Sequence, residues 1–210
     1  MFERLSDLAR SDQDKERLSE IWFNCAFGLL TDFLNGEYTD EAIQLFQRMD
    51  EKLKHCLDLK NCREDWFRAM VNMVAYTCEK GQISTACLYT ERAFIRARDF
   101  EDHPELMTHW AKAAGNLLIS AADGQDHDSA EKYCFQVISA WIGNPGNTGL
   151  IAVMLKNIVL YYKLSLLPRD RSITGVIDFM QGKIKEFPEK EKTIHSLIKQ
   201  LQEHYIEKAI

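Results

Sequence analysis

The chain has 210 residues, of which 46% are hydrophobic and only 10 are glycine and 4 proline, which is typical of a folded globular protein. Its formal net charge of −6 is unlike the basic balance of general nucleic-acid-binding proteins, so we expect no nucleic-acid partner. We find no uninterrupted run of 18 apolar residues, so no membrane-spanning helix is expected either.

The first residues carry acidic side chains and lack an apolar core, so they do not predict a secretory signal. The 6 cysteines follow no Cys-x-x-Cys spacing and mostly stand among apolar residues, so we interpret them as reduced core thiols. These features predict a cytoplasmic or nuclear location. The cysteines are Cys25, Cys56, Cys62, Cys78, Cys87 and Cys134.

Residues 1–14 predict a weak helix. Phe2 and Leu5 stand 44 positions before Phe46 and Met49, which lie in the second helix of a predicted repeat. Two interpretations remain open: a frayed cap, or the continuation of a longer array.

Three sets of residues recur at an interval of 44 positions, which indicates four copies of one unit. The predicted repeats cover residues 15–58, 59–102, 103–146 and 147–187. The sets are Trp22, Trp66 and Trp110; Ala42, Ala86 and Ala130; and Asp40, Ser84, Asp128 and Ser172.

Each repeat is predicted to hold two helices, the first running from about Lys15 to Leu34 in the first repeat. At 100° per residue, the positions three, four and seven after each tryptophan share its face. Small residues recur there beside the large ring, which lets neighbouring helices pack closely. These positions are Cys25, Ala26 and Leu29, then Ala69, Met70 and Met73, then Ala113, Ala114 and Leu117, then Asn157, Ile158 and Tyr161.

A turn with glycine or proline follows each first helix, and we expect the glycines to supply the left-handed helix stop. The second helices are then predicted to start at the N-caps Asp40, Ser84, Asp128 and Ser172. The glycine-rich segment 143–149 is predicted to be a hinge. Residues 189–209 carry one apolar stripe, which suits a C-terminal capping helix.

The pattern resembles the tetratricopeptide (TPR) repeat, in which a tryptophan precedes small or apolar residues, an alanine opens the second helix, and an aromatic residue follows. The first repeat shows all of these, with Phe46 as the aromatic residue, whereas Thr90 and Cys134 replace it in the next two. One departure is the interval, which is 44 residues here and about 34 in the family. The chain is therefore similar to a long-helix variant.

The resemblance implies an all-α fold, a right-handed superhelix of about four helix pairs plus the capping helix. It also implies that the first helices line a concave groove that holds a peptide or a partner helix.

A column of polar donors runs along the first helices on the side away from the tryptophans. Asparagine can satisfy both groups of a peptide bond, and the cations suit a carboxylate, an acidic side chain or a phosphate. We predict that this column binds the partner, with a merely solvated helix face as the alternative. Its members are Asn24, Arg68, Asn72, Lys112, Asn116 and Lys156.

Phe23 and Phe27 lie beside the column. Core packing against the next repeat is the preferred interpretation, and an apolar docking patch is the alternative.

No catalytic motif stands out, so no enzymatic activity and no cofactor are predicted. The acidic clusters around His103 and between Asp123 and Asp128 match no zinc or EF-hand spacing, so no metal site is predicted.

These observations predict a non-enzymatic protein–protein interaction module, an adaptor or scaffold that binds a peptide or helix of another protein, possibly an acidic or C-terminal segment. The alternative is a peptide- or ligand-sensing regulator in which binding changes the superhelix curvature at the 143–149 hinge.

Overall fold

The structure is a computed structural model that describes residues 11–100, 103–124, 126–144 and 191–206, with shorter pieces at 147, 149–150, 153, 177–178, 180–182, 184–185 and 188. Over these residues the chain is helical and contains no strand, which confirms the predicted all-α class. The superhelix and the number of repeats stay predictions. The positions Lys156, Ser172 and most of the fourth predicted repeat lie outside the described residues.

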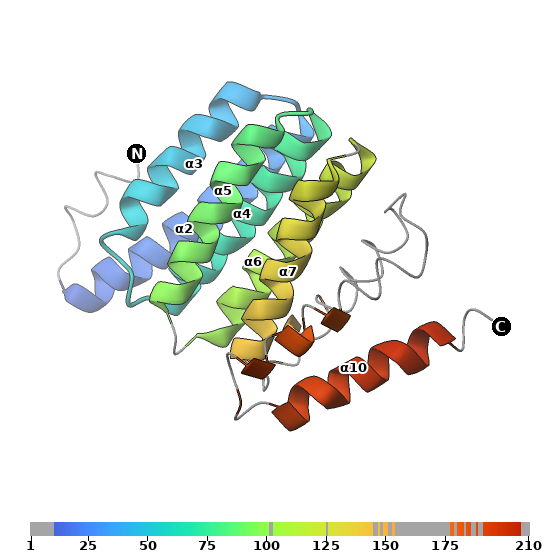
Figure 1. Cartoon of the computed structure of the whole chain (residues 1–210). Coiled ribbons are helices and arrows are strands. Elements are labelled where there is room, and N and C mark those ends of the chain that lie inside the picture. The colour runs from blue at the N-terminus through green and yellow to red at the C-terminus, as the bar shows by residue number, and fades with distance from the viewer. Residues whose placement is uncertain are drawn as a thin grey trace. The chain divides into compact units, whose positions relative to one another are not determined.

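The chain divides into two compact units, one ending at Phe100 and the other beginning at Glu101 (Figure 1). The first compact unit holds α2 (Asp12–Asn35), α3 (Thr39–Leu53), α4 (Lys60–Glu79) and α5 (Ile83–Asp99). The second holds α6 (Pro104–Asp123), α7 (His127–Gly143) and α10 (Glu191–Ile206), with α6 packed against α7.

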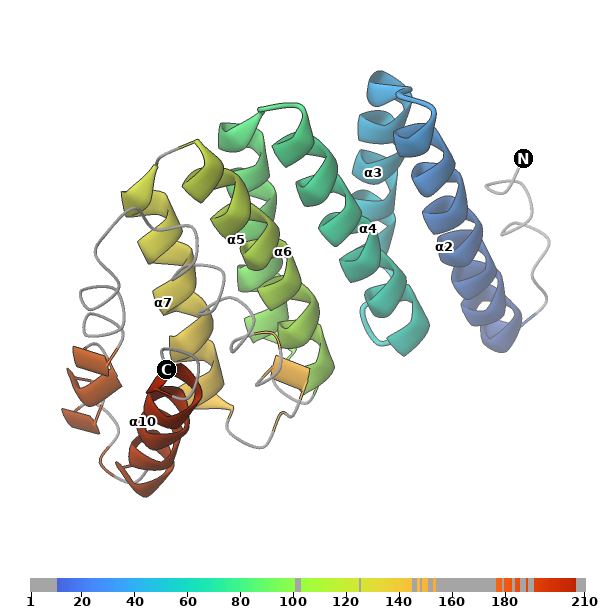
Figure 2. The ribbon, with the colours of Figure 1, turned by 90° about the vertical axis from the view of Figure 1, so that its right-hand side faces the viewer.

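Within the first compact unit, α4 packs against α2, α3 and α5, and α2 packs against α3 and α4. Figure 2 shows α2 and α4 side by side. Each tryptophan helix thus packs against the helix that follows it along the chain, α2 against α3 and α4 against α5. This is expected for antiparallel helix pairs joined by short turns.

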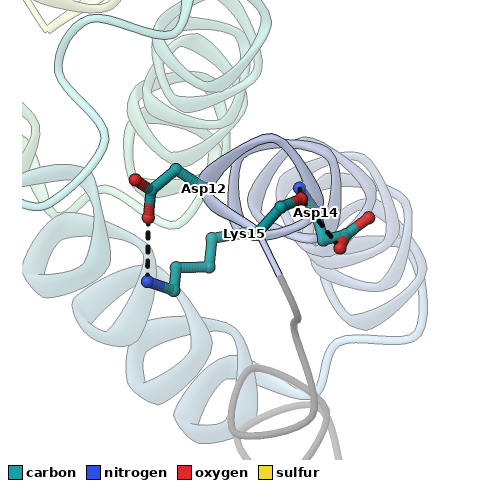
Figure 3. Close-up of polar contacts among 4 residues, drawn as sticks. Asp12, Asp14 and Lys15 are labelled. Carbon is teal, nitrogen blue, oxygen red and sulfur yellow. Dashed lines mark hydrogen bonds and ion pairs between the residues drawn. The ribbon is translucent and has the colours of Figure 1, made fainter.

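The start of α2 follows from its sequence. The Ser11 hydroxyl accepts a hydrogen bond from the Asp14 backbone N–H at 3.1 Å and donates one to the Asp14 carboxylate at 2.8 Å. Asp12 forms an ion pair with Lys15 at 2.9 Å, which holds the pKa of that carboxyl below its usual value (Figure 3). Both acids lie in the first turn, where the helix dipole favours negative charge.

The predicted N-caps of the second helices are wrong by two residues. Asp40, Ser84 and Asp128 each lie inside the first turn, because the helices start earlier, after Tyr38, Gln82 and Asp126. Of these three caps, the Asp126 carboxylate is the one that accepts a backbone hydrogen bond, from Ser129 at 3.1 Å. The acids at positions 40 and 128 still suit the dipole at the helix start.

The turns also differ from the expectation that glycine takes the left-handed conformation. Gly81 does so, with φ of 70°, but in the first turn it is Glu37 that has φ of 61°. At Gly36 a Cβ atom would lie 2.6 Å from the Tyr38 ring, so a larger residue there would have to displace that exposed ring. The Glu37 side chain accepts a hydrogen bond from Lys80 at 2.8 Å, which links the two turns.

The core confirms part of the tryptophan ladder. Trp66 and Trp110 are fully buried, whereas Trp22 is only half-buried. The Phe46 ring lies 5.9 Å from Trp66 and 5.5 Å, edge-on, from Tyr89, so three helices meet around Phe46. The ladder of Ala42, Ala86 and Ala130 is buried as well.

The interpretation of the cysteines as core thiols holds for part of the set. Cys56, Cys62 and Cys134 are buried, Cys78 and Cys87 are half-buried, and Cys25 is exposed. All six lie within the described residues, and none forms a disulfide. Cys25 departs from the expectation, since its side chain is exposed on α2.

Candidate interaction surface

A surface cavity of about 430 Å³ lies between α2 and α4. It is the place where two members of the predicted donor column, Asn24 and Arg68, come together. Its lining residues are Glu20, Ile21, Asn24 and Cys25 from α2 and Asn61, Glu64, Asp65 and Arg68 from α4.

Polar pairs join α2 to α4 at a constant sequence separation. Asn61 donates to the Glu20 carboxylate at 2.9 Å, and Asn72 donates to the Thr31 hydroxyl at 3.3 Å, in both cases across 41 residues. A constant separation along two helices means that they run in the same direction, because in an antiparallel pair the separation would change at every contact. The pairs therefore fix α2 and α4 as parallel neighbours in register.

Two further contacts keep the same separation of 41 residues. Asn24 hydrogen-bonds to the Asp65 side chain, and the Arg68 guanidinium lies 4.2 Å from the centre of the Phe27 ring. Arg68 also forms an ion pair with Asp65 at 3.1 Å. The donors of the column are thus engaged within the first compact unit, where they hold its two tryptophan helices together.

Asp65 is the most buried acid of the cavity, with 7% of its surface exposed. Burial raises the pKa of its carboxyl, and the Arg68 cation and the Asn24 hydrogen bond oppose that rise. The direction of the net shift is upward, so burial outweighs the neighbouring cation.

The charge of the cavity is negative. Glu20, Glu64 and Asp65 contribute three carboxylates, while Arg68 is the cation among the lining residues. Lys60, which is not among the lining residues, forms an ion pair with the Glu64 carboxylate at 3.4 Å. An entering side chain that donates hydrogen bonds or carries positive charge therefore meets more favourable partners here than a carboxylate does.

The structure places the remaining members of the column as follows. Asn72 is half-buried, Lys112 is exposed on α6, and Asn116 is half-buried on the same helix in the second compact unit. Lys156 lies outside the described residues. A continuous column across all repeats stays a prediction.

The two phenylalanines beside the column have structural contacts. Phe23 is fully buried and packs edge-on against Trp22 at 5.1 Å, so its side chain offers no surface to a partner. Phe27 is half-buried beneath Arg68. Both placements agree with the preferred interpretation of core packing.

Several lining residues were missed by the sequence reasoning, namely Glu20, Ile21, Cys25, Asn61, Glu64 and Asp65. A signal for them existed, because the polar pairs named between α2 and α4 share a separation of 41 residues, three fewer than the repeat interval. The difference of three residues reflects the register in which α2 and α4 pack side by side. Adding 41 to the number of each polar residue on α2 would have given its neighbour on α4.

Within the part of the chain that the structure describes, no group of three or more His, Cys, Asp and Glu side chains is placed to hold a metal ion. Over the same residues no helix combines the length and apolar character that crossing a membrane requires.

Comparison of the chain with protein-family models, with curated proteins and with solved structures gives no match.

Proposed function

We propose that the protein is a non-enzymatic interaction module, an adaptor or scaffold, that binds a peptide or helix of another protein at the α2–α4 cavity. The observation that carries the proposal is this cavity, open to solvent and lined mainly by polar side chains from two parallel helices. Rigid helices hold these side chains in place, which favours specific recognition.

The apolar Ile21, 42% exposed, lies in the same lining and can pack against an aliphatic stem of the partner. The carboxylates around it suit the head group of a lysine or arginine side chain. The cavity therefore favours a partner segment with a basic side chain. The acidic or C-terminal segment expected from the sequence suits it less well, because the lining holds three carboxylates and one cation.

The resemblance to TPR repeats supports the same class of function, since the cavity lies between two of the predicted first helices. The sensing alternative depends on the 143–149 segment, of which residues 145, 146 and 148 lie outside the described part. Among the described residues, no contact favours it over the interaction module.

The test is affinity capture from a lysate with the intact chain and with a Glu20→Lys/Glu64→Lys variant, which reverses the charge of the cavity without touching the buried Asp65. A partner captured by the intact chain and lost with the variant would support the proposal. The matched control is Glu41→Lys/Glu51→Lys, which makes the same exchange at two exposed positions of α3.

Circular dichroism would establish that both variants keep their helices. If both variants capture the same partner as the intact chain, the cavity is not the binding site. If the control loses the partner as well, the effect is one of net charge and the assignment to the cavity is wrong.

A further inference from the structure

Two buried thiols lie against each other where α3 ends and α4 begins. Cys56 and Cys62 are 6% and 0% exposed, and their side chains form a hydrogen bond with one another. Neither residue lines the α2–α4 cavity, so the pair is separate from the site of the proposed function.

The local backbone brings the two side chains together. The Leu59 N–H donates to the Cys56 carbonyl at 3.1 Å, which closes a turn over residues 56–59. The Arg63 N–H then donates to the Leu59 carbonyl at 3.2 Å, which forms the first turn of α4. The buried Arg63 guanidinium also donates to the Leu57 carbonyl inside the first of these turns. Two successive turns thus return Cys62 to the side of Cys56.

The hydrogen bonds give the two thiols different roles. The Cys56 thiol donates to the Lys52 carbonyl at 3.1 Å, so its sulfur is the acceptor in the contact with Cys62. The Cys62 hydrogen bond lowers the pKa of Cys56, burial opposes this change, and the Lys52 ammonium adds to it. Because the thiolate is the nucleophile in sulfur chemistry, Cys56 is the thiol that reacts first.

Access from solvent points to the same order. Cys56 keeps a small exposed area and lies in the segment that connects α3 to α4, in which Lys54, His55 and Asp58 are exposed. Connecting segments open locally at a lower cost in free energy than packed helices do. Cys62 has no exposed surface, so the sulfur within its reach is that of Cys56.

We propose that Cys56 and Cys62 are a redox-active pair that reacts with a peroxide and closes to an intramolecular disulfide. The Cys56 thiolate attacks one oxygen of hydrogen peroxide, the O–O bond breaks, and Cys56 becomes a sulfenic acid. The departing hydroxide takes up the proton lost by the Cys56 thiol and leaves as water. The Cys62 sulfur then attacks the Cys56 sulfur, the S–O bond breaks, and the hydroxyl group leaves as water with the Cys62 proton. Two thiols are oxidised and one peroxide is reduced to two waters.

The first step favours the second. The hydrogen bond to Cys56, burial and the charge of the Cys56 thiolate raise the pKa of Cys62. Oxidation of Cys56 removes the thiolate and its charge, so Cys62 then loses its proton more readily. Two sulfurs in hydrogen-bond contact also need to approach by less than about 2 Å to reach the bonded length of about 2 Å. A thiol reductant that attacks the disulfide restores both thiols.

The test treats the full chain with hydrogen peroxide, blocks the remaining thiols and digests the product with trypsin without reductant. Trypsin cleaves after Lys54, Lys60 and Arg63, so Cys56 and Cys62 fall in separate peptides, 55–60 and 61–63. The disulfide joins these two peptides, and mass spectrometry detects the joined product. We expect this product to form at least about tenfold faster than any other cysteine pairing and to disappear with dithiothreitol.

Three variants separate the steps. In Cys62→Ser the resolving thiol is absent, so the sulfenic acid of Cys56 should persist and be trapped by dimedone. In Cys56→Ser, Cys62 should remain a free thiol under the same treatment. The matched control Cys25→Ser removes the exposed cysteine and should leave formation of the joined peptides unchanged. Circular dichroism checks that all three variants remain helical.

Absence of the joined peptides from the natural chain would overturn the inference, and so would a main disulfide between either thiol and a different cysteine. Oxidation of Cys62 in the Cys56→Ser variant would show that the assigned order is wrong. Equally fast formation of the joined peptides in concentrated urea would assign the reaction to the short spacing in sequence and not to the folded geometry. The measurement on the natural chain decides the matter even where a variant fails to fold.

Discussion

The two tryptophan helices of the first compact unit, α2 and α4, carry the same sequence pattern and have different surroundings. α4 packs against three helices and its tryptophan is fully buried, while the tryptophan of α2 is half-buried. The comparison teaches that a repeated pattern specifies which side of a helix is apolar, and that burial of this side depends on whether a neighbour is present. Trp22 and Trp66, which the pattern makes equivalent, should therefore contribute different amounts to the free energy of unfolding.

The largest expected effect breaks this comparison directly. Trp66→Ala should lower the free energy of unfolding by about 3–5 kcal/mol, because it removes a fully buried ring and leaves a cavity. Trp22→Ala should cost about 1–2 kcal/mol, since only part of that ring is removed from water. Urea denaturation of both variants at one pH measures the difference. Equal losses would show that the two faces are equally covered.

A smaller effect on the free energy of unfolding is expected for the ion pair between Asp50 and Arg92. Asp50 on α3 is 4% exposed and pairs with Arg92 on α5 at 2.7 Å, while its other oxygen is buried without a hydrogen-bond partner. Arg92→Ala should therefore cost about 2 kcal/mol in urea denaturation, because a buried carboxylate loses its cation.

This value is below that of a fully buried pair because the Arg92 side chain is 48% exposed. The comparison variant Lys80→Ala removes the exposed pair with Glu37 and should leave the free energy of unfolding nearly unchanged. A loss as large as that of Arg92→Ala would mean that exposure does not separate the two kinds of pair.

The smallest expected effect is the pH-dependent contribution of Asp65, in the α2–α4 cavity, to the free energy of unfolding. Burial raises the pKa of Asp65 in the folded chain, so the folded state holds its proton to higher pH than the unfolded state does. The contribution of this group to the free energy of unfolding therefore falls as the pH rises from its ordinary pKa through the raised one.

Asp65→Asn removes this contribution. Relative to the natural chain, the variant should gain stability as the pH rises from the ordinary pKa of an aspartate, about 3.9, through the raised pKa of Asp65. Urea denaturation across this range measures the gain, and Arg68→Ala should steepen the pH dependence because it removes the cation that opposes burial. A variant that loses relative stability over the same range would show that the Arg68 pair outweighs burial.

Part of the candidate site could be predicted from the sequence. Asn24 and Arg68 were placed on one face from the angle per residue, and they do line one cavity. Their partners Asp65 and Phe27 could not be read in the same way, because each contact joins two helices and depends on the direction and offset of their packing. Phe23 and Phe27 show the same limit, since the angle alone did not separate a fully buried side chain from one lying under a guanidinium.

By itself the sequence determined the helical class, the breaks between α2 and α5, and the apolar side of each helix, because these follow from a fixed rotation per residue and from local turn chemistry. Only the tertiary structure decided which of the matched positions are buried, which acids face the cavity and which donors are already paired. The physical reason is that desolvation and pairing belong to two or more helices at once. Trp22 and Trp66, with the same residue in the same register, differ for that reason alone.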